Sequence, residues 1–456
     1  MKRKLMILMG GDVLLALLAF YIGLLVRVGY AEARADMVSG PFGRLPLFVF
    51  TLFVVSYVLE NYNIAKHRSK KEMVTNILFG GTVSFVLLST QFFLYPDLMI
   101  GRGALIIAVM VFVFFQSFWH AVYIIGFDHP YLTERMIVLG SGPLAAKIGD
   151  LVHASRSRFN HMLTGYVSCE REAGGAVPEG AIIGHADDLR DIVVREKVSK
   201  IIVALSERRG IFPLRDLLTC KLNGIEIVDA PAFFEQVTDK LMVESMTPSW
   251  LIFATGFRRT AFFTVAKRGV DVALSVCVMA LVLPLFPFIA LLVKLDSPGP
   301  VFFSQVRVGK REREFVLYKF RTMCQNAEST TGAVWAQEND PRLRSIGRFM
   351  RKCRLDELPQ LYNVLRGDMS LVGPRPERPE FVEKLKEAIP FYSKRHFVQP
   401  GITGWAQVSF PYGASVDDAL EKLRYELYYI KNMSPILDTI IVLQTFKVVF
   451  FGRGGR

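Results

Sequence analysis

Four long apolar runs in the first third of the sequence constrain this chain more than any other feature. They cover residues 5–26, 45–59, 77–95 and 104–127. A helix needs about 20 apolar residues to cross the hydrocarbon core of a bilayer, and all but the second run approach that length. We therefore predict a membrane-embedded α-helical region of four transmembrane helices within residues 1–130.

Basic residues beside these runs predict their orientation. Lys2, Arg3 and Lys4 precede the first run, and a second basic cluster lies at residues 66–71, between the second and third runs. Because lysine and arginine favour the cytoplasmic side, both ends of the region are expected in the cytoplasm, with the rest of the chain following there. The basic start also fits a signal peptide, but no small-residue cleavage site follows, which favours a retained helix.

The composition narrows the class of protein. Hydrophobic residues make up 51% of the chain, which excludes a disordered protein, and the formal net charge is +13. This charge suits anionic lipid or anionic substrates. The cysteines are far apart without a C-x-x-C pair, which excludes a disulfide scaffold and a zinc ribbon and fits a reducing compartment. They are Cys169, Cys220, Cys277, Cys324 and Cys353.

Residues 131–255 alternate predicted strands with predicted helices. Strands are expected at 136–139, 200–205 and 225–229, with helices between and after them at 213–222 and 231–241. This alternation is typical of a small parallel, Rossmann-like α/β domain.

The sequence G-S-G-P-L-A at 140–145 is half of a dinucleotide-binding fingerprint. The other half would be an acidic residue that closes the second strand. Glu170 is the best candidate, although it lies later than the usual spacing. We favour a structural or regulatory domain without a cofactor, and a dinucleotide site is the alternative.

A fifth apolar run, residues 270–293, differs from the others because Pro284 and Pro287 interrupt it. Proline removes a backbone donor and clashes with the preceding turn, so the helix should bend there. A straight span would carry the following basic region out of the cell. A helix over residues 268–295 that enters and leaves by the same face keeps its flanking basic residues cytoplasmic, and we favour this re-entrant form.

The catalytic part of the chain is predicted at residues 256–456. Six basic residues crowd into 342–354, directly before L-D-E-L-P-Q at 355–360. Such a run is ordinarily a solvated face or one that contacts lipid head groups. The acidic pair Asp356 and Glu357 argues for more than that, because it adjoins the cations at the start of a predicted helix.

Asp356 has two interpretations that the residues alone leave open. As an N-cap it would only accept a backbone N–H of the helix that Pro359 begins. As a catalytic group it would be a carboxylate that neighbouring arginines keep ionised and that attacks phosphorus to give an aspartyl-phosphate type intermediate. Glu357 would then hold Mg²⁺ to neutralise the charge of a diphosphate.

Two further motifs support phosphate chemistry. Y-K-F-R-T-M at 318–323 alternates aromatic and cationic residues, as a strand with one binding face would. Arg375 lies between Pro374 and Pro376, which limits its backbone freedom and the entropy lost when it binds an anion. There is no P-loop motif, His396 is the only histidine after Asp296, and Cys353 has no obvious histidine partner.

At this point the sequence resembles the bacterial sugar transferase family, the polyprenyl-phosphate hexose-1-phosphate transferases. The matching motifs run in order from about residue 267 to the C-terminus. They are K-R-x-x-D at 267–271, the helix broken at Pro284, D-S-P-G-P-V-F-F at 296–303, Q-x-R-x-G at 305–309, Y-K-F-R-T-M at 318–323, L-D-E-L-P-Q at 355–360, N-V-L-R-G-D-M-S at 363–370, V-G-P-R-P at 372–376 and P-G-I-T-G-W-A-Q at 400–407.

The resemblance implies a bacterial inner-membrane, multi-pass enzyme with a cytoplasmic catalytic domain. It would move a sugar-1-phosphate from a UDP-sugar to undecaprenyl phosphate, release UMP and prime exopolysaccharide or O-antigen synthesis. Asp356 would be the nucleophile and Glu357 the Mg²⁺ ligand. Cationic and polar residues of the motifs would contact the donor: Arg321, Arg351, Arg354, Arg375 and Gln407.

The chain departs from the family pattern in places. Many members carry an N-G-R-like sequence after the residue matching Gln407, where this chain has V-S-F-P-Y-G at 408–413. Gln399 replaces a basic residue, and Leu283 replaces a serine before Pro284. The first two changes bear on sugar and nucleotide contacts rather than on the phosphoryl chemistry.

Other interpretations remain. A membrane-anchored regulator that senses nucleotide at 140–145 would not need Asp356, and a lipid-diphosphate hydrolase would use water in place of the lipid phosphate. Nucleic-acid binding is not expected, because the positive charge adjoins an acidic site and membrane helices. A homodimer is possible, and the apolar run Pro435–Phe451 fits either a core helix or an interfacial one.

Overall fold

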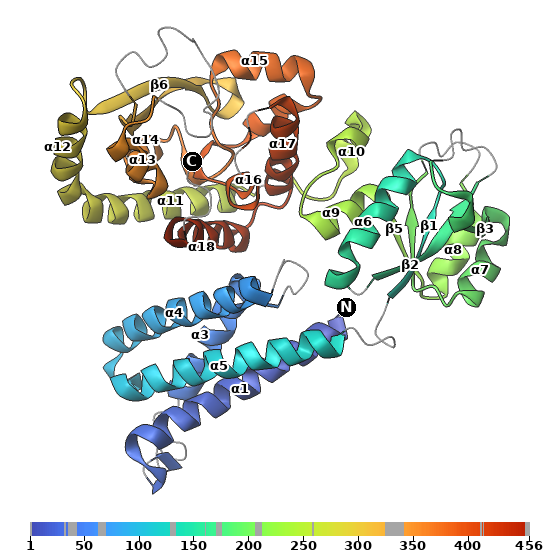
Figure 1. Cartoon of the computed structure of the whole chain (residues 1–456), viewed down its shortest axis with the longest axis horizontal. Coiled ribbons are helices and arrows are strands. Elements are labelled where there is room, and N and C mark those ends of the chain that lie inside the picture. Colours follow the sequence, from blue (N-terminus) through green and yellow to red (C-terminus); the bar gives the residue numbers. More distant parts are fainter. Residues whose placement is uncertain are drawn as a thin grey trace. The chain divides into compact units, whose positions relative to one another are not determined.

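The computed structural model describes most of the chain, which divides into two compact units, Met1–Phe233 and Phe234–Arg456 (Figure 1). The domain limits predicted near residues 130 and 255 stay predictions. The described residues are 2–31, 33–34, 43–62, 70–127, 134–159, 161–169, 176–205, 212–257, 260–323, 342–410, 413 and 415–451.

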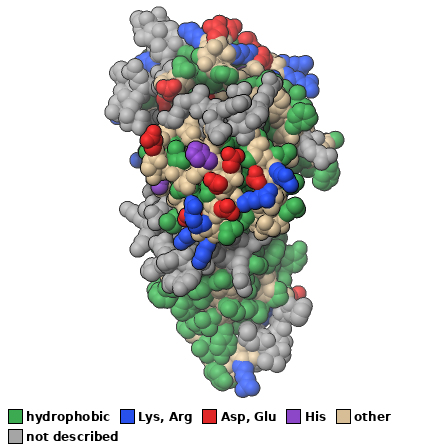
Figure 2. Space-filling view, turned by 90° about the vertical axis from the view of Figure 1, so that its right-hand side faces the viewer, with side chains coloured by type: hydrophobic (Ala, Val, Ile, Leu, Met, Phe, Trp, Pro, Cys, Tyr) green, Lys and Arg blue, Asp and Glu red, His purple; other side chains and the backbone are tan. Residues whose placement is uncertain are grey.

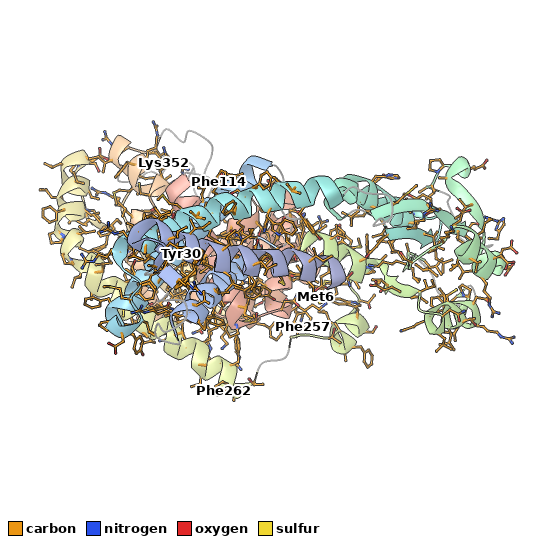
Figure 3. The ribbon with its side chains drawn as sticks, turned by 90° about the horizontal axis from the view of Figure 1, so that it is seen from below. Met6, Tyr30, Phe114, Phe257, Phe262 and Lys352 are labelled. Carbon is orange, nitrogen blue, oxygen red and sulfur yellow. The ribbon has the colours of Figure 1, made fainter. Side chains whose placement is uncertain are left out.

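The predicted apolar helices at the N-terminus are confirmed. They are α1 (Lys2–Val28), α3 (Arg44–Val58), α4 (Lys70–Leu94) and α5 (Arg102–Phe127). All but α3 are long and apolar enough to cross a membrane. Their outer surface is mainly hydrophobic, as the lower part of Figure 2 shows, and Met6, Tyr30 and Phe114 project from it (Figure 3). The protein is therefore a membrane protein.

Small residues let α1 and α5 pack closely. A Cβ added at Gly23 would lie 2.7 Å from the Cβ of Ala108 and 2.7 Å from the carbonyl oxygen of Ala104. Without a hydrophobic effect between helices in lipid, such close backbone approach is a main source of helix association. Any larger side chain at Gly23 would separate the two helices.

A polar cluster also joins these helices inside the apolar region. Gln116 of α5 donates from Nε2 to Asp12 Oδ2 of α1 at 2.5 Å and to Ser56 Oγ of α3 at 3.0 Å. His120 Nε2 lies 3.1 Å from the same Asp12 oxygen. All four side chains are buried. Polar groups in lipid are costly unless they pair, so this cluster fixes which helix faces meet.

The region after these helices is a parallel α/β domain, as its alternating pattern predicts. Its five strands are all parallel and lie in the order β3-β2-β1-β4-β5. The strands are β1 (Glu134–Leu139), β2 (His161–Ser168), β3 (Ile182–His185), β4 (Lys200–Val203) and β5 (Glu226–Asp229), and the helices are α6 (Pro143–Phe159), α7 (Leu189–Arg195), α8 (Leu214–Leu222) and α9 (Ala230–Thr238).

The sequence patterns indicate β1, β4 and β5 but not β2 and β3. Thr164 and Gly165 interrupt the apolar pattern of β2, and β3 is a short strand that includes Gly184. The glycine turn after β1 has its expected form, because Gly140 has a φ of +131°. The backbone N–H of Ala176 donates to the carbonyl of Ser141 at 3.0 Å, so this turn is partly covered. Glu170 lies outside the described residues.

The second unit contains the proline-interrupted helix. It consists of α11 (Ala261–Val282), a 3-10 turn η7 (Leu283–Leu285) that contains Pro284, and α12 (Phe286–Asp296). Figure 1 shows α12 turned sharply away from the axis of α11. The bend therefore occurs at the predicted proline. Phe262, which projects outward near the start of α11 (Figure 3), is 82% exposed, and Phe288 of α12 is 68% exposed.

The rest of this unit is a mixed α/β fold built on two small sheets. The β6–β7 hairpin is antiparallel, with Phe303 opposite Lys319, and β8 pairs with β9 in parallel. The elements are β6 (Phe302–Val308), η8 (Lys310–Glu312), β7 (Glu314–Phe320), α13 (Ser345–Lys352), η9 (Leu355–Glu357), α14 (Gln360–Arg366), β8 (Ser370–Val372), α15 (Pro379–Ala388), η10 (Tyr392–Phe397), β9 (Gly401–Thr403), α16 (Trp405–Ser409), α17 (Val416–Lys431) and α18 (Pro435–Phe451).

The last helix, α18, has one buried face and one exposed apolar face. Ile441 is fully buried, and Thr445 shares a 2.6 Å hydrogen bond with Thr403 of β9. Ile436 and Phe446 are about half exposed. The helix is thus part of the core on one side. Its placement at a bilayer surface stays a prediction.

Candidate active site

Asp356 and Glu357 lie in the 3-10 turn η9, directly before α14. Arg354 precedes the turn in the left-handed region, with a φ of +57°, and this reverses the chain after α13. The helix itself begins at Gln360, and its N-cap is Pro359. Asp356 is therefore near the helix but does not cap it, so the capping interpretation is wrong. Both carboxylates are 6% exposed.

Three cations from separate segments surround Glu357. Its Oε1 accepts a 2.9 Å hydrogen bond from Arg375 Nη2. The same oxygen lies 3.4 Å from Lys319 Nζ of β7 and 3.5 Å from Arg354 Nη1. Burial alone would raise the pKa of Glu357, but these three cations together hold it far below its usual range. Glu357 is therefore ionised at neutral pH.

The pKa of Asp356 shifts in the opposite direction to that of Glu357. Burial and the adjacent charge of Glu357 raise the pKa of its carboxyl, whereas Lys319, Arg351 and Arg375 act in the other direction. Its Oδ1 is buried and has no hydrogen-bond partner. A buried carboxylate oxygen without a partner is costly and unusual, and it is typical of a group that awaits a substrate or an ion.

Lys319 reaches this site from the hairpin. Burial lowers its pKa to about 8, with Glu357 opposing that change. The lysine lies in the Y-K-F-R-T-M motif, but it was not among the individual residues predicted for the site. The alternation of the motif could have indicated Lys319, because residues two positions apart in a strand, such as Lys319 and Arg321, lie on the same side of it.

Arg321, directly after β7, and Arg351 of α13 have different partners. Arg351 donates from Nε to Thr322 Oγ1 at 3.0 Å, and its positive charge lowers the pKa of Asp356. Arg321 instead donates to the carbonyls of Ser297 and Pro298, at 2.6 and 3.0 Å. It joins the end of β7 to the end of α12, and its predicted contact with substrate phosphate stays a prediction.

Hydrogen bonds to three consecutive backbone carbonyls fix the loop that carries Arg375. Arg375 O accepts from Arg395 Nη2 at 2.7 Å, Pro374 O accepts from the N–H of Gly401 at 2.9 Å, and Pro376 O accepts from Arg307 at 3.1 Å. These hydrogen bonds hold the loop in place, and the structural role predicted for the two prolines stays a prediction.

Gln407, on α16, donates from Nε2 to the carbonyl of Ile402 at 3.2 Å, and its Oε1 is buried without a partner. No contact between Gln407 and the acidic pair is recorded among the described residues. Its predicted contact with substrate stays a prediction.

The K-R-x-x-D motif at 267–271 attaches α11 to this domain. Arg268 donates to the carbonyls of Val364 and Leu365 at 2.6 and 2.9 Å. Asp271 Oδ2 accepts from Ser370 Oγ at 2.7 Å. At the other end, Ile289 and Val293 of α12 belong to the same apolar cluster as Phe320 and Met350. Both arms of the bent helix therefore contact one domain.

The donor set can accommodate Mg²⁺. This ion usually binds to one or two carboxylates together with substrate phosphates, and here two carboxylates are adjacent, with Asp356 Oδ1 unpartnered. The ion pairs of Glu357 with Lys319, Arg354 and Arg375 are made by Oε1. Within the described part of the chain, no cluster of three or more His, Cys, Asp or Glu residues is positioned for a metal, so substrate oxygens would complete the shell.

Comparison with known proteins places the chain in a family. A family profile for bacterial sugar transferases matches residues 262–452. The chain is 44% identical over 242 residues to a UDP-N-acetylgalactosamine-undecaprenyl-phosphate N-acetylgalactosaminephosphotransferase of Aeromonas hydrophila, covering 53% of this chain and 56% of that protein. It is 32% identical over 329 residues to an undecaprenyl-phosphate glucose phosphotransferase of Komagataeibacter xylinus, covering 71% and 60%.

A shorter relative is covered almost completely. The exopolysaccharide production protein PSS of Rhizobium leguminosarum bv. phaseoli is 40% identical over 186 residues, which are 40% of this chain and 93% of that protein. By contrast, the matched segments span little more than half the length of the A. hydrophila and K. xylinus proteins. The chain belongs to the bacterial sugar transferase family.

Proposed function

We propose that this protein transfers a sugar-1-phosphate from a UDP-sugar to undecaprenyl phosphate and so primes the synthesis of a bacterial polysaccharide. The observation that carries the proposal is the buried Asp356–Glu357 pair, which several cations surround while Asp356 Oδ1 has no partner. The names of the relatives, which act on undecaprenyl phosphate, support the choice of acceptor.

In the first step, a carboxylate oxygen of Asp356 attacks the phosphorus that bears the sugar. A new P–O bond forms to the aspartate, the P–O bond to the leaving nucleotide breaks, and UMP departs with the electron pair. In the second step, a phosphate oxygen of undecaprenyl phosphate attacks the same phosphorus. The lipid diphosphate sugar forms, and the carboxylate of Asp356 is regenerated.

The cations make an attack by one anion on another feasible. Arg375 and Lys319 lie within 3.4 Å of Glu357, and their positive charges also lower the pKa of Asp356. They are therefore positioned to stabilise a charged phosphoryl transition state. We propose that Glu357 and the diphosphate hold Mg²⁺. When bound, this ion would neutralise phosphate charge.

We also propose that α11 and α12 form a re-entrant membrane helix. The support is that α11 is joined to the catalytic domain through Arg268 and Asp271 and α12 through Ile289 and Val293, while Leu281 and Phe288 near the bend are exposed. Exposed apolar side chains at the bend would enter the bilayer. The active site would then lie at the cytoplasmic face of the inner membrane, within reach of a soluble nucleotide and a lipid phosphate.

For the α/β domain we propose a Rossmann-like fold without a bound dinucleotide. The strand order β3-β2-β1-β4-β5 supports the fold. The hydrogen bond from Ala176 to Ser141, which partly covers the glycine turn, supports the second part. A homodimer also remains a proposal.

The test uses the full chain in lipid nanodiscs with UDP-glucose, UDP-galactose and their N-acetylated analogues. Without undecaprenyl phosphate, we expect release of about one UMP per active site and a sugar phosphate adduct on the peptide that contains Asp356, detected by mass spectrometry. Asp356→Asn should give neither, whereas the exposed control Asp417→Asn should give both. Full activity of Asp356→Asn would refute the mechanism.

The same experiment separates the alternatives. Continued UMP release without the lipid, together with free sugar phosphate, would identify a hydrolase. A nucleotide-sensing regulator would release no UMP from any donor of the panel. A lipid-linked sugar that forms only when undecaprenyl phosphate is added would support the transferase.

A further inference from the structure

A buried ion pair holds the backbone of the loop that carries Arg375. Arg395 of η10 and Glu426 of α17 are each 4% exposed, and Arg395 Nη2 lies 2.7 Å from Glu426 Oε1. The same Nη2 donates to the carbonyl oxygen of Arg375 at 2.7 Å. One guanidinium thus joins a carboxylate of α17 to the backbone of the residue whose side chain donates to Glu357 at 2.9 Å.

The orientation of the Arg395 guanidinium is fixed by more than this pair. Its Nη1 donates to Tyr392 Oη at 2.5 Å, and Tyr392 is buried. Because a guanidinium is a planar fork, contacts at both Nη atoms fix its plane as well as its position. Arg395 Nε is buried and has no hydrogen-bond partner, which costs free energy. The arrangement therefore favours the placement of the two Nη groups over complete pairing of the side chain.

The charges of Arg395 and Glu426 depend on each other. Burial alone would lower the pKa of Arg395, but Glu426 raises it above its usual value. Burial raises the pKa of Glu426, and Arg395 opposes that change. A buried ion pair adds little net stability, because desolvation of both charges offsets their attraction. The position that the pair imposes on the loop therefore explains it better than stability does.

Helix α17 contacts the same part of the chain at a second point. Tyr429 follows Glu426 by about one helical turn, so the two side chains lie on one face of α17. Tyr429 Oη lies 3.1 Å from the carbonyl oxygen of Val372, the residue that ends β8 just before the Arg375 loop. Both side chains are buried. A rigid helix that holds both points places a loop residue more precisely than the loop could by itself.

We propose that Arg395 and Glu426 are positioning residues, which fix the backbone of Arg375 so that its guanidinium meets Glu357 and the donor phosphate in one geometry. The inference rests on the proposed function. Among the described residues, no hydrogen bond or ion pair joins Arg395 or Glu426 to the acidic pair, so their effect passes through Arg375. A displacement of about 1 Å at a reacting group can lower a rate by about 10²-fold.

The test measures UMP release in nanodiscs from a UDP-sugar without undecaprenyl phosphate. Glu426→Gln keeps the shape of the side chain but removes the charge that holds Arg395, so the rate constant of the burst should fall by about tenfold or more. The burst amplitude counts the active sites and should not change. A lower amplitude with a normal rate constant would mean only that fewer molecules fold, and it would overturn the positioning role.

Glu235→Gln is the matched control. Glu235 also pairs with a cation of α17, since its Oε2 lies 2.6 Å from Lys431 Nζ, and it is similarly shielded at 14% exposure. The same substitution thus breaks an ion pair of the same helix without touching the Arg375 loop. Its burst rate constant should stay within about twofold of the wild type.

A double-mutant cycle tests whether the effect passes through Arg375. In the Arg375→Ala background, the guanidinium that Arg395 and Glu426 would position is absent. Adding Glu426→Gln should then change the burst rate constant by less than about twofold, because residues that act through one group are not additive. An equal loss in both backgrounds would overturn the proposal.

Arg395→Lys keeps the proposal testable if Glu426→Gln does not fold. Lysine retains a positive charge beside Glu426, but it lacks the planar fork that contacts Tyr392, Glu426 and the Arg375 carbonyl together. The burst rate constant should again fall by about tenfold, and a wild-type rate constant in the folded variant would overturn the proposal. Failure of the proposed function is distinguishable, since the wild-type protein would then give no burst with any donor.

Discussion

The protein contains two buried polar clusters that differ in their charge balance. In the apolar helices, one carboxylate, Asp12, is shared by Gln116 and His120. Both clusters are buried, and each contains a carboxylate oxygen without a hydrogen-bond partner, Asp12 Oδ1 and Asp356 Oδ1. They differ in their cations: in the catalytic domain Lys319, Arg354 and Arg375 pair with Glu357.

We propose that the first cluster is structural and the second reactive. Gln116 bridges α1, α3 and α5, so the first cluster specifies which helix faces meet. In the second, the pKa values of Asp356 and Glu357 shift in opposite directions, because burial and Glu357 raise that of Asp356 whereas Arg375, Lys319 and Arg354 lower that of Glu357. Two neighbouring carboxyl groups whose pKa values shift in opposite directions are typical of catalytic sites.

The largest effect that tests this comparison is expected at Arg375. Arg375→Ala removes the side chain that donates to Glu357 at 2.9 Å, and it removes a cation that lowers the pKa of Asp356. The kcat should therefore fall by about 10²- to 10³-fold. The measurement is UMP release in nanodiscs. Arg366→Ala, whose side chain is 56% exposed, is the matched control and should stay within about twofold. A loss below about threefold in Arg375→Ala would argue against the reactive role of the cluster.

The pH profile should show an intermediate effect. In the proposed mechanism Asp356 must be ionised to attack, and its raised pKa would place the acid limb of the activity profile above the range of an ordinary aspartate. Lys319 is charged below its pKa of about 8 and loses that charge as the pH rises, so activity should fall on the alkaline side. At one pH unit above the pKa, only about a tenth of the lysine remains protonated.

Lys319→Arg gives a sharp check of the alkaline limb. Arginine stays protonated far above that range, so this variant should retain its activity at pH 9 relative to pH 7, whereas the wild type loses several-fold. Lys394→Arg, a lysine of η10, is the control and should keep the wild-type profile. An unchanged alkaline limb in Lys319→Arg would assign it to another group.

Much of this organisation could be predicted from the sequence, because it depends on local patterns. Apolar length identified the N-terminal helices, and Pro284 identified the bend, since proline breaks a helix wherever it stands. The acidic pair was found because charged residues cluster around it in the sequence. Strands β2 and β3 were missed because Thr164 and Gly165 interrupt the apolar pattern of the first and Gly184 that of the second.

The rest depends on contacts between distant segments. Arg395 and Glu426 are 31 positions apart, and neither lies in a motif that predicts burial, yet they form an ion pair behind Arg375. The partners of Arg321 likewise come from the end of α12, 24 positions away. A sequence pattern gives the charge of such residues but not the groups they face. It therefore could not distinguish arginines that pair within the fold, such as Arg321, from those that lie beside the acidic pair.

The smallest effect is expected in the apolar helices, and it concerns stability alone. Asp12→Ala and Gln116→Ala should each lower the unfolding temperature of the protein in detergent. A double-mutant cycle should give a coupling of about 1 kcal/mol, the size usual for polar pairs between membrane helices. Ser117→Ala, which removes a hydroxyl that donates to Val113 O of its own helix, is the control and should show no coupling to Asp12. UMP release per folded protein should not change in any of these variants. A large loss of catalysis in Asp12→Ala would contradict the separation of the two clusters, because it would give the membrane carboxylate a part in the reaction.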